Sequence, residues 1–187
     1  MHISPELIAI VVVAIFVVWA VAAYNGLIAM RTRVQNGWAE IDVQLKRRHD
    51  LIPNLVESVR GYMQHERSTL EAVTQARTQA MAAPAGNIQQ RSDAEGALSG
   101  ALGKLFAVAE NYPQLRAVES VQMLQEQLTS TENRIAYARQ FYNDEVMKYN
   151  TAQSTFPRNM FAGLFGFAPA TMFSASDSER APVAVKI

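Results

Sequence analysis

His65 and Glu66 come closest to a metal or acid–base motif in this 187-residue chain. A zinc-protease motif of the form H-E-x-x-H needs a second histidine four residues after the first, and that position is Thr69. The other histidines, His2 and His49, complete no triad. Cysteine is absent, which excludes disulfides, thiolate ligands and cysteine nucleophiles. The sequence therefore predicts no metal site, no cofactor and no catalytic residue, and we expect the His65-Glu66 pair to lie on a solvated helix face.

Charged residues form two weaker patterns. Glu57, Glu66 and Glu71 could line one helix, but the Glu-x-x-His pairs of a di-iron bundle are missing. Three consecutive cations at residues 46–48 could contact lipid phosphates or RNA, or could complement the C-terminus of a helix, which is the favoured interpretation. Because the chain has 17 basic and 17 acidic residues, it has no overall field to attract nucleic acid, and no nucleic-acid partner is predicted.

Small residues recur within one predicted helix. Gly96, Gly100 and Gly103, together with Ser99, follow a helical pattern and do not follow a strand, so they do not resemble a phosphate-binding loop. Two interpretations remain open: the small residues permit a close helix–helix contact, or they form a poorly packed surface turn.

An apolar run dominates the N-terminal part of the chain. Residues 7–23 are continuously apolar, and 24 uncharged residues separate Glu6 from Arg31. As a helix these residues would reach roughly 36 Å, more than the about 30 Å of a bilayer hydrocarbon core. The sequence thus predicts a transmembrane helix, with the anchor side chains Leu7, Ile10, Val13, Phe16, Trp19 and Ala23. A cleaved signal peptide is the alternative, but residues 1–6 contain no Lys or Arg.

Basic residues near the predicted span indicate its orientation. None precedes it, whereas five occur within residues 31–50, namely Arg31, Arg33, Lys46, Arg47 and Arg48. Short segments rich in Lys and Arg stay on the cytoplasmic side of a membrane. We therefore expect the N-terminus outside and the body in the cytoplasm.

The body carries helical periodicity throughout. Val34, Trp38, Ile41 and Leu45 form a stripe typical of an amphipathic helix, so we expect the anchor helix to continue through Asn25-Gly26 into the body. The expected elements after it are a break and restart at residues 50–53, a helix to about residue 82 with a weak point at Gly61, a linker at 82–87, a helix over 88–111 and a last helix over 115–150. The predicted fold class is all-α: a transmembrane helix that continues into a long-helix antiparallel bundle of about four helices.

The C-terminal tail is irregular and rich in aromatic residues. Residues 155–173 contain five of the eight phenylalanines, and fully burying each Phe is worth about 1.5–3 kcal/mol. We expect the tail to pack on the bundle, on a neighbouring subunit or on the membrane through Phe156, Pro157, Phe161, Phe165, Phe167 and Phe173. The predicted division is an outer N-terminus (1–6), a transmembrane helix (7–24), a helical bundle (25–153) and this tail (154–187).

The sequence from Tyr24 to Glu66 resembles the LemA family. The resemblance rests on a Tyr-Asn-x-Leu start after the membrane helix, on Trp followed by Ile-Asp-Val-Gln-Leu-Lys-Arg-Arg, and on Asp-Leu-Ile-Pro-Asn-Leu-Val. In this chain the motif residues are Tyr24, Asn25, Trp38, Ile41, Asp42, Leu45, Arg47, Arg48, Asp50, Pro53 and Asn54. The segment FPRNMFAGLFGF, with a final aromatic at Phe173, is also similar to the family's C-terminal segment.

The resemblance implies a protein of a bacterial inner or cell membrane, with a short outer N-terminus and an antiparallel helical bundle. It implies no reaction, cofactor or catalytic residue. Two positions depart from the usual pattern: Asn36-Gly37 replaces less flexible residues before Trp38, and His49 stands where an aromatic residue is common. A further hypothesis is that Asp42 and Arg48 form ion pairs within the bundle.

Three functions compete for these features. The leading hypothesis is a non-enzymatic, membrane-anchored scaffold that forms a homo-oligomer, with contacts from the anchor, the small-residue helix and the aromatic tail; its protein partners are unknown. In the second, the tail is an interfacial segment that makes a second contact with the lipid bilayer and shapes or senses it. The third is an enzyme whose site is assembled from scattered Glu, His and Arg residues.

Overall fold

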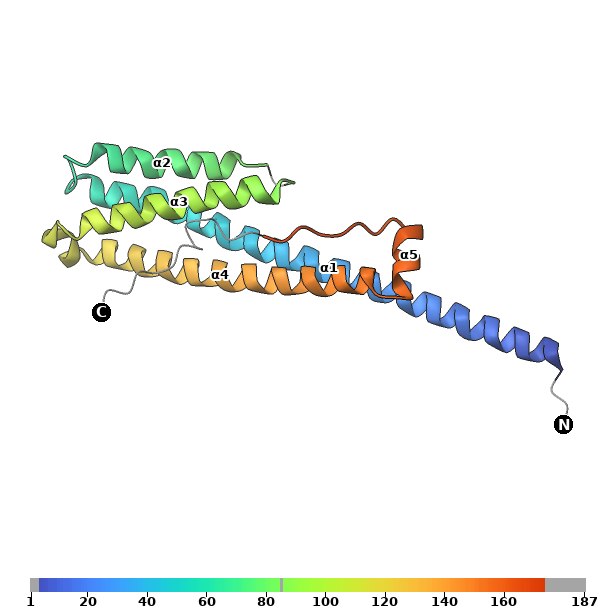
Figure 1. The fold of residues 1–187 in the computed structure, drawn as a ribbon. Helices are drawn as coiled ribbons and strands as arrows, with labels where there is room; N and C mark the ends of the chain where they lie inside the picture. The colour runs from blue at the N-terminus through green and yellow to red at the C-terminus, as the bar shows by residue number, and fades with distance from the viewer. Residues whose placement is uncertain (1–3, 85, 174–187) are drawn as a thin grey trace, which may run out of the picture.

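The computed structural model describes residues 4–84 and 86–173 (Figure 1). The elements follow in the order α1 (Pro5–Arg60), α2 (Arg67–Ala82), α3 (Ile88–Ala109), the 3-10 helix η1 (Pro113–Ala117), α4 (Glu119–Ser154) and α5 (Arg158–Leu164). No strand occurs in these two ranges, and the predicted all-α fold built from long helices is confirmed. Residues 174–187, the end of the predicted tail, and residues 1–3 lie outside the described residues.

Helix α1 contains 56 residues, so it is about 84 Å long. It begins at a conventional N-terminal cap, where the Ser4 hydroxyl accepts a hydrogen bond of 3.4 Å from the Leu7 amide. Pro5 fits the first turn because a residue there donates no hydrogen bond within the helix, so the missing N–H of proline costs nothing. The helix runs through Asn25-Gly26 without interruption, as the sequence predicts.

The predicted break at residues 50–53 is wrong, because α1 continues through Pro53 to Arg60. A proline inside a helix loses one hydrogen bond and costs about 3 kcal/mol or more. Here Pro53 is exposed, while Ile52 and Leu55 beside it are buried in the core. Their burial offsets the local penalty, and the helix ends at Gly61, which the sequence suggested only as a weak point.

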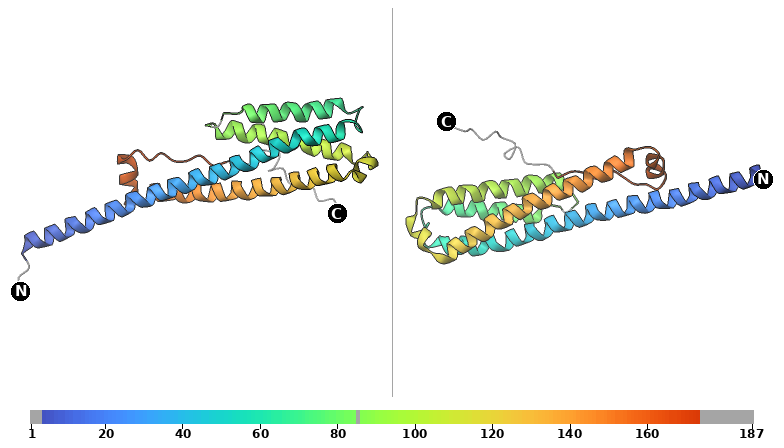
Figure 2. Two further views of the ribbon diagram at one scale, coloured as in Figure 1. Left: turned by 180° about the vertical axis from the view of Figure 1, so that it is seen from behind. Right: turned by 90° about the horizontal axis from the view of Figure 1, so that it is seen from below.

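The bundle has two halves along its length (Figures 1 and 2). In the distal half, the end of α1 and the start of α4 pack with the α2–α3 hairpin around a mainly aliphatic core. In the stalk, α1 and α4 continue as an antiparallel pair, and the C-terminal segment lies along them. The distal core contains Ile52, Leu55, Val59, Met63, Val73, Leu98, Leu105 and Leu128; the stalk core contains Leu27, Ile41, Leu45, Ile135, Tyr142, Val146, Tyr149, Phe167 and Phe173.

Gly37 allows α1 and α4 to approach closely in the stalk. A Cβ atom at this position would lie 3.3 Å from the Cα of Tyr142 and 3.5 Å from the ring of Phe141. The departure from the family pattern at Asn36-Gly37 thus has a packing role, and it leaves α1 helical.

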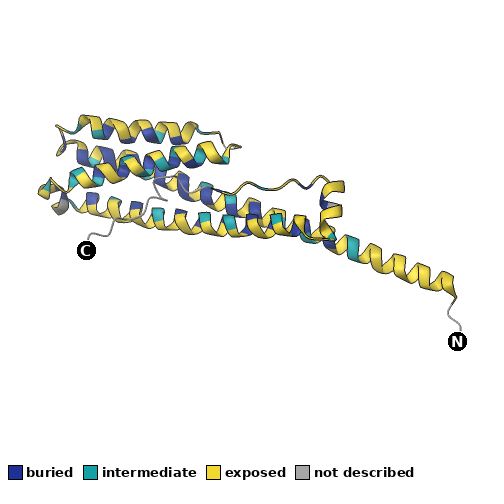
Figure 3. Cartoon of the chain, viewed as in Figure 1, coloured by how far each residue is buried: buried dark blue, intermediate teal, exposed yellow. Residues whose placement is uncertain are grey.

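Beyond the stalk, the N-terminal part of α1 projects alone from the body (Figures 1 and 2). Its surface is exposed over most of its length (Figure 3). Within it, an 18-residue window has a mean hydropathy of 2.9, and only 6% of that window is buried. This part of α1 is therefore long and apolar enough to cross a membrane.

Candidate membrane-interface site

The apolar run of α1 meets the body at Ala23. The predicted anchor side chains Leu7, Ile10, Val13 and Phe16 are exposed, and Trp19 is half-buried. Ala23 is the first buried residue of α1, followed by Leu27. The exposed apolar surface therefore ends where the stalk begins.

Tyr24 of α1 contacts two aromatic residues of the C-terminal part of the chain at this point, and we name Tyr24, Phe165 and Phe167 the aromatic collar. The Tyr24 ring lies 5.1 Å from the Phe165 ring and 5.7 Å from the Phe167 ring, both edge to face. Such pairs contribute about 0.5–1.5 kcal/mol beyond the burial of their surface. The collar thus holds the start of the C-terminal segment at the level where the apolar run leaves the body.

Helix α5 lies beside the collar and runs across the long axis of α1: it is seen from the side in Figure 1 and end-on in the right panel of Figure 2. Ala162 is buried toward the body. Met160 and Leu164 of α5 are 66 and 77% exposed, and Phe156, in the turn before α5, is 74% exposed. We name these three residues the apolar edge. The side chain of Phe161, another predicted contact, lies outside what the structure describes.

Beyond the collar, side chains of α4 bind the backbone of the segment 167–173. Asn150 Nδ2 donates to the Ala170 carbonyl at 2.8 Å, and the Ala170 amide donates to Asn150 Oδ1 at 2.9 Å. Asn143 makes the same pair of bonds with Phe173, at 3.0 and 2.8 Å. The Tyr142 hydroxyl donates to the Thr171 carbonyl at 2.7 Å, and burial raises the pKa of Tyr142, which keeps this donor protonated.

Sequence analysis missed both asparagines. Asn143 and Asn150 are seven residues apart, beside the apolar stripe of α4. A pair of amide side chains with helical spacing is the signal that could have identified them. Of the predicted tail contacts, Phe167 and Phe173 are buried in the stalk, Pro157 is half-buried, and Phe156 and Phe165 are exposed.

Two cations lie on the body side of the collar, where Arg31 and Arg33 are exposed on α1. Arg158 is exposed at the start of α5. Burial raises the pKa of Tyr149, and the charge of Arg31 opposes this rise, which places the guanidinium close to the stalk. An apolar surface and a group of cations are thus adjacent along the α1 axis.

A second cluster of polar residues is buried where the stalk meets the distal half. The Arg48 guanidinium pairs with the carboxylates of Glu95 and Glu132 and donates to the Ser99 hydroxyl at 2.8 Å. His49 Nε2 lies 3.0 Å from Glu95 Oε1. Burial acts to raise the pKa of Glu95, but the hydrogen bond to His49 and the charge of Arg48 outweigh burial and hold this pKa below its ordinary value.

This buried cluster answers two sequence interpretations. Arg48 and Asp42 do form ion pairs, since Asp42 pairs with Arg91 at 2.7 Å. The interpretation of residues 46–48 as cations at a helix end is wrong, because α1 continues to Arg60. Arg48 and Glu95 have no exposed side-chain surface, so a substrate in solution does not touch them, and their role is to join α1, α3 and α4.

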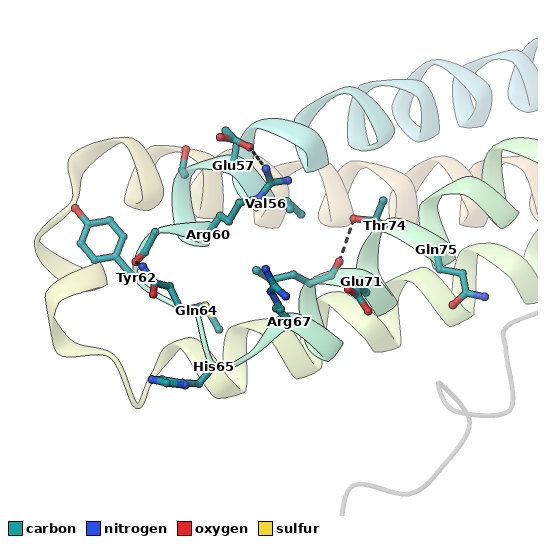
Figure 4. Close-up of a pocket in the computed structure, with 14 residues that line it drawn as sticks. Val56, Glu57, Arg60, Tyr62, Gln64, His65, Arg67, Glu71, Thr74 and Gln75 are labelled. Atoms are coloured by element: carbon teal, nitrogen blue, oxygen red, sulfur yellow. Dashed lines mark hydrogen bonds and ion pairs between the residues drawn. The ribbon is translucent and has the colours of Figure 1, made fainter.

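The remaining polar candidates lie at the distal tip. His65 and Glu66 occupy the loop between α1 and α2, where Glu66 accepts a hydrogen bond of 3.3 Å from the Tyr112 hydroxyl. His65 lines an open cavity of about 1540 Å³, together with residues of α1, the loop after it and α2 (Figure 4). Within the described ranges, no group of three His, Asp or Glu residues is placed to hold a metal ion.

The small residues of α3 border a shallow groove against α2, with a volume of about 400 Å³. Ala72 and Ala76 of α2 line it together with Gly100 and Ala101. A Cβ atom on Gly100 or Gly103 would meet no heavy atom within 4 Å. These two glycines therefore do not mediate a close helix contact within the chain.

Comparison with known proteins adds the following similarities. The model of the LemA family matches residues 37–187. Magnetosome protein MamQ 1 of Paramagnetospirillum magneticum is 26% identical in an alignment 200 positions long, which covers 94% of this chain and 74% of that protein. Magnetosome protein MamQ of Magnetospirillum gryphiswaldense is 23% identical, with 90 and 71% covered, and Protein LemA of Metamycoplasma hominis is 26% identical, with 93 and 79% covered.

Proposed function

Because the chain belongs to the LemA family, we propose that it is a non-enzymatic helical scaffold of a bacterial membrane that meets the bilayer at two points. The first point is the N-terminal part of α1, which crosses the membrane. The second is the apolar edge together with the aromatic collar, which rests in the interface between headgroups and acyl chains.

The placement of α5 is the observation that carries this proposal. The apolar edge on and just before this helix is exposed, α5 lies at the level where the apolar run of α1 ends, and its axis crosses that of α1. A helix with this orientation lies in the membrane plane when α1 stands along the membrane normal. Each large apolar side chain that leaves water contributes up to about 1.5–3 kcal/mol, which favours a membrane contact over exposure.

The cations beside the collar support the expected orientation. Arg31, Arg33 and Arg158 would face the headgroups of the leaflet on the body side. Basic residues near a span stay in the cytoplasm, so we propose that the N-terminus lies outside and the bundle inside. The unbroken helix from Ala23 to Arg60 then carries the distal tip roughly 55 Å from the membrane surface.

A fluorescence experiment on the full chain tests the second contact. Because the chain has no cysteine, Leu164→Cys gives one position for an environment-sensitive dye in liposomes. We expect blue-shifted emission and quenching by lipids that carry a spin label near the headgroups. Met123→Cys, on an exposed position of α4 in the distal half, is the matched control and should stay accessible to aqueous iodide.

The proposal fails if the dye at residue 164 is as accessible to iodide as the dye at residue 123. In that case α5 does not enter the bilayer. Substituting Ser for Met160 and Leu164 distinguishes a lipid contact of α5 from a protein contact. A lost protein contact would be seen in detergent as well as in liposomes, whereas a lost lipid contact would be seen in liposomes alone.

A further inference from the structure

The segment 167–173 has a three-residue repeat of burial in the groove between α1 and α4. Phe167 and Phe173 are buried and Ala170 is half-buried, whereas the four residues between them are exposed. This period matches polyproline II, which has three residues per turn, and Pro169 supplies a φ angle that suits it. The segment therefore presents one face to the groove.

The two asparagines of α4 match that repeat in length. Seven residues of helix separate Asn143 from Asn150, a distance of roughly 10.5 Å. In polyproline II, three residues would separate Ala170 from Phe173 by roughly 9.3 Å. Each amide side chain can therefore exchange two hydrogen bonds with one residue of the segment, and this pairing reads backbone conformation and not side-chain identity.

Side-chain recognition comes from the two ends of the segment. The Phe173 ring lies 6.0 Å from the Trp38 ring and 4.7 Å from the Arg139 guanidinium. Phe167 packs on Tyr24 in the collar. Together with half-buried Ala170, these contacts select the pattern Phe-x-x-Ala-x-x-Phe in an extended segment, which is how aromatic grooves recognise polyproline II ligands.

We propose that this groove is an exchangeable peptide-binding site whose partner in the membrane is the segment 167–173 of a second copy of the chain. The second copy carries the one sequence already shown to fit. This inference rests on the proposed membrane anchoring, because anchors in one bilayer give all copies the same orientation and bring their grooves to the same height. Exchange then requires only that the segment of one copy can reach sideways to the groove of the next.

The connecting segment supplies that reach. Residues 155–166 separate the end of α4 from Phe167, and seven of these twelve residues form α5. With α5 kept as a helix, those seven span roughly 10 Å and the five extended residues outside it roughly 17 Å. The total of roughly 27 Å is more than twice the helix diameter of about 10–12 Å. Exchange preserves each contact of the groove, which makes it a low-cost route to assembly. A shared membrane further raises the effective concentration of the second copy.

Cysteine crosslinking in the membrane tests this exchange. Gln153 Nε2 donates to the Ala168 carbonyl at 3.4 Å, so these two positions lie next to each other. Two full-length chains, one with Ala168→Cys and one with Gln153→Cys, carry different affinity tags and are expressed in the same cells. After treatment with a short bis-maleimide, we expect a product that contains both tags.

A second set of variants tests whether binding in the groove gives rise to that product. Asn143→Ala with Asn150→Ala in the Gln153→Cys chain removes four hydrogen bonds, and we expect the two-tag product to fall at least about tenfold. Asn133→Ala, at an exposed position of the same helix, is the matched control and should leave the yield unchanged. A two-tag product that the asparagine variants do not reduce would come from collision, and it would overturn the inference.

A third chain, with both cysteines, distinguishes the remaining results. If it gives only an intrachain product while the mixed chains give none, each segment stays on its own body and the inference is wrong. The dye at residue 164 can be read in the same membranes. A bilayer signal there without a two-tag product would reject exchange and leave the proposed function intact.

Discussion

The distal half and the stalk are stabilised by different chemistry. The distal half surrounds a core of Leu, Ile and Val side chains that come from four helices. The stalk has two helices, and its third side is covered by a segment held through asparagine amides and aromatic rings. An aliphatic core forms with its own helices, whereas the stalk is complete only when the C-terminal segment is bound. The difference suggests a constant distal body and a conditional stalk, and four predictions test it.

The largest effect is expected at the junction of the two halves. Glu95→Leu leaves Arg48 buried with a single carboxylate partner, and removing one member of a buried pair costs about 3–5 kcal/mol. Denaturant unfolding in detergent, followed by circular dichroism, measures this loss. Glu57→Ala breaks an exposed pair with Arg60 and should cost only about 0–1 kcal/mol; equal effects of the two variants would contradict a structural role for the buried cluster.

The second prediction separates release of the segment from unfolding. Phe173→Ala should weaken docking of the segment by about 2–3 kcal/mol, because the ring is buried against Trp38 and Arg139. We expect faster proteolysis within residues 165–173 and little change in the unfolding midpoint of the bundle. Leu98→Ala in the distal core should do the reverse, with a loss of about 2–5 kcal/mol in global stability. A single shared transition for both variants would make the two halves one cooperative unit.

The third prediction uses two glycines with opposite surroundings. Gly37→Ala places a methyl group 3.3 Å from the Tyr142 backbone, and the overpacking should outweigh the helix preference for Ala and destabilise the stalk by about 1 kcal/mol. Gly103→Ala meets open space and should stabilise α3 by about 0.5–1 kcal/mol. Thermal melts of both variants, in one detergent, give the two signs, and equal signs would refute the close approach of α1 and α4.

The smallest effect concerns pH. The pKa of Glu95 is held below its ordinary value of 4.5 in the folded protein, so its contribution to stability is present above pH 4.5 and is lost as the pH falls through the folded pKa. Glu95→Gln should therefore flatten the stability profile on the acid side of pH 4.5. Unfolding midpoints of both proteins at pH 3 to 6 measure this, and parallel curves would assign the acid dependence to other carboxylates.

Periodicity predicted the long helices because it reflects which face of each helix is buried. The stripe from Val34 to Leu45 and the unbroken passage through Asn25-Gly26 both follow from local pattern. Pro53 was misjudged because the proline rule is local, while the burial of Ile52 and Leu55 depends on helices distant in the sequence. The predicted break therefore appeared at the wrong turn.

The candidate site was only partly predictable. Composition identified the aromatic tail, but the residues that hold it are polar and carry no pattern in isolation. Asn143 and Asn150 acquire their role only when the chain folds back by about twenty to thirty residues, as the bonds to Ala170 and Phe173 require. The partners of Arg48 on α3 and α4 are likewise set by the connections between the helices, which no spacing within α1 encodes.

Because α1 is one continuous helix, the distal tip moves together with the N-terminal part of the helix. With the N-terminal part of α1 crossing the bilayer as proposed, the helix has no joint between membrane and distal tip. Transmembrane helices tilt by about 20° on average, with a range set by bilayer thickness, and a tilt of that size would displace the tip sideways by roughly 19 Å over the ~55 Å of helix beyond the collar. Helix α5 lies across the axis on one side of α1, and its contact with the membrane would favour one direction of tilt. A change in local membrane thickness would change the tilt of α1, and the tilt would in turn change the distance between the distal tips of neighbouring molecules.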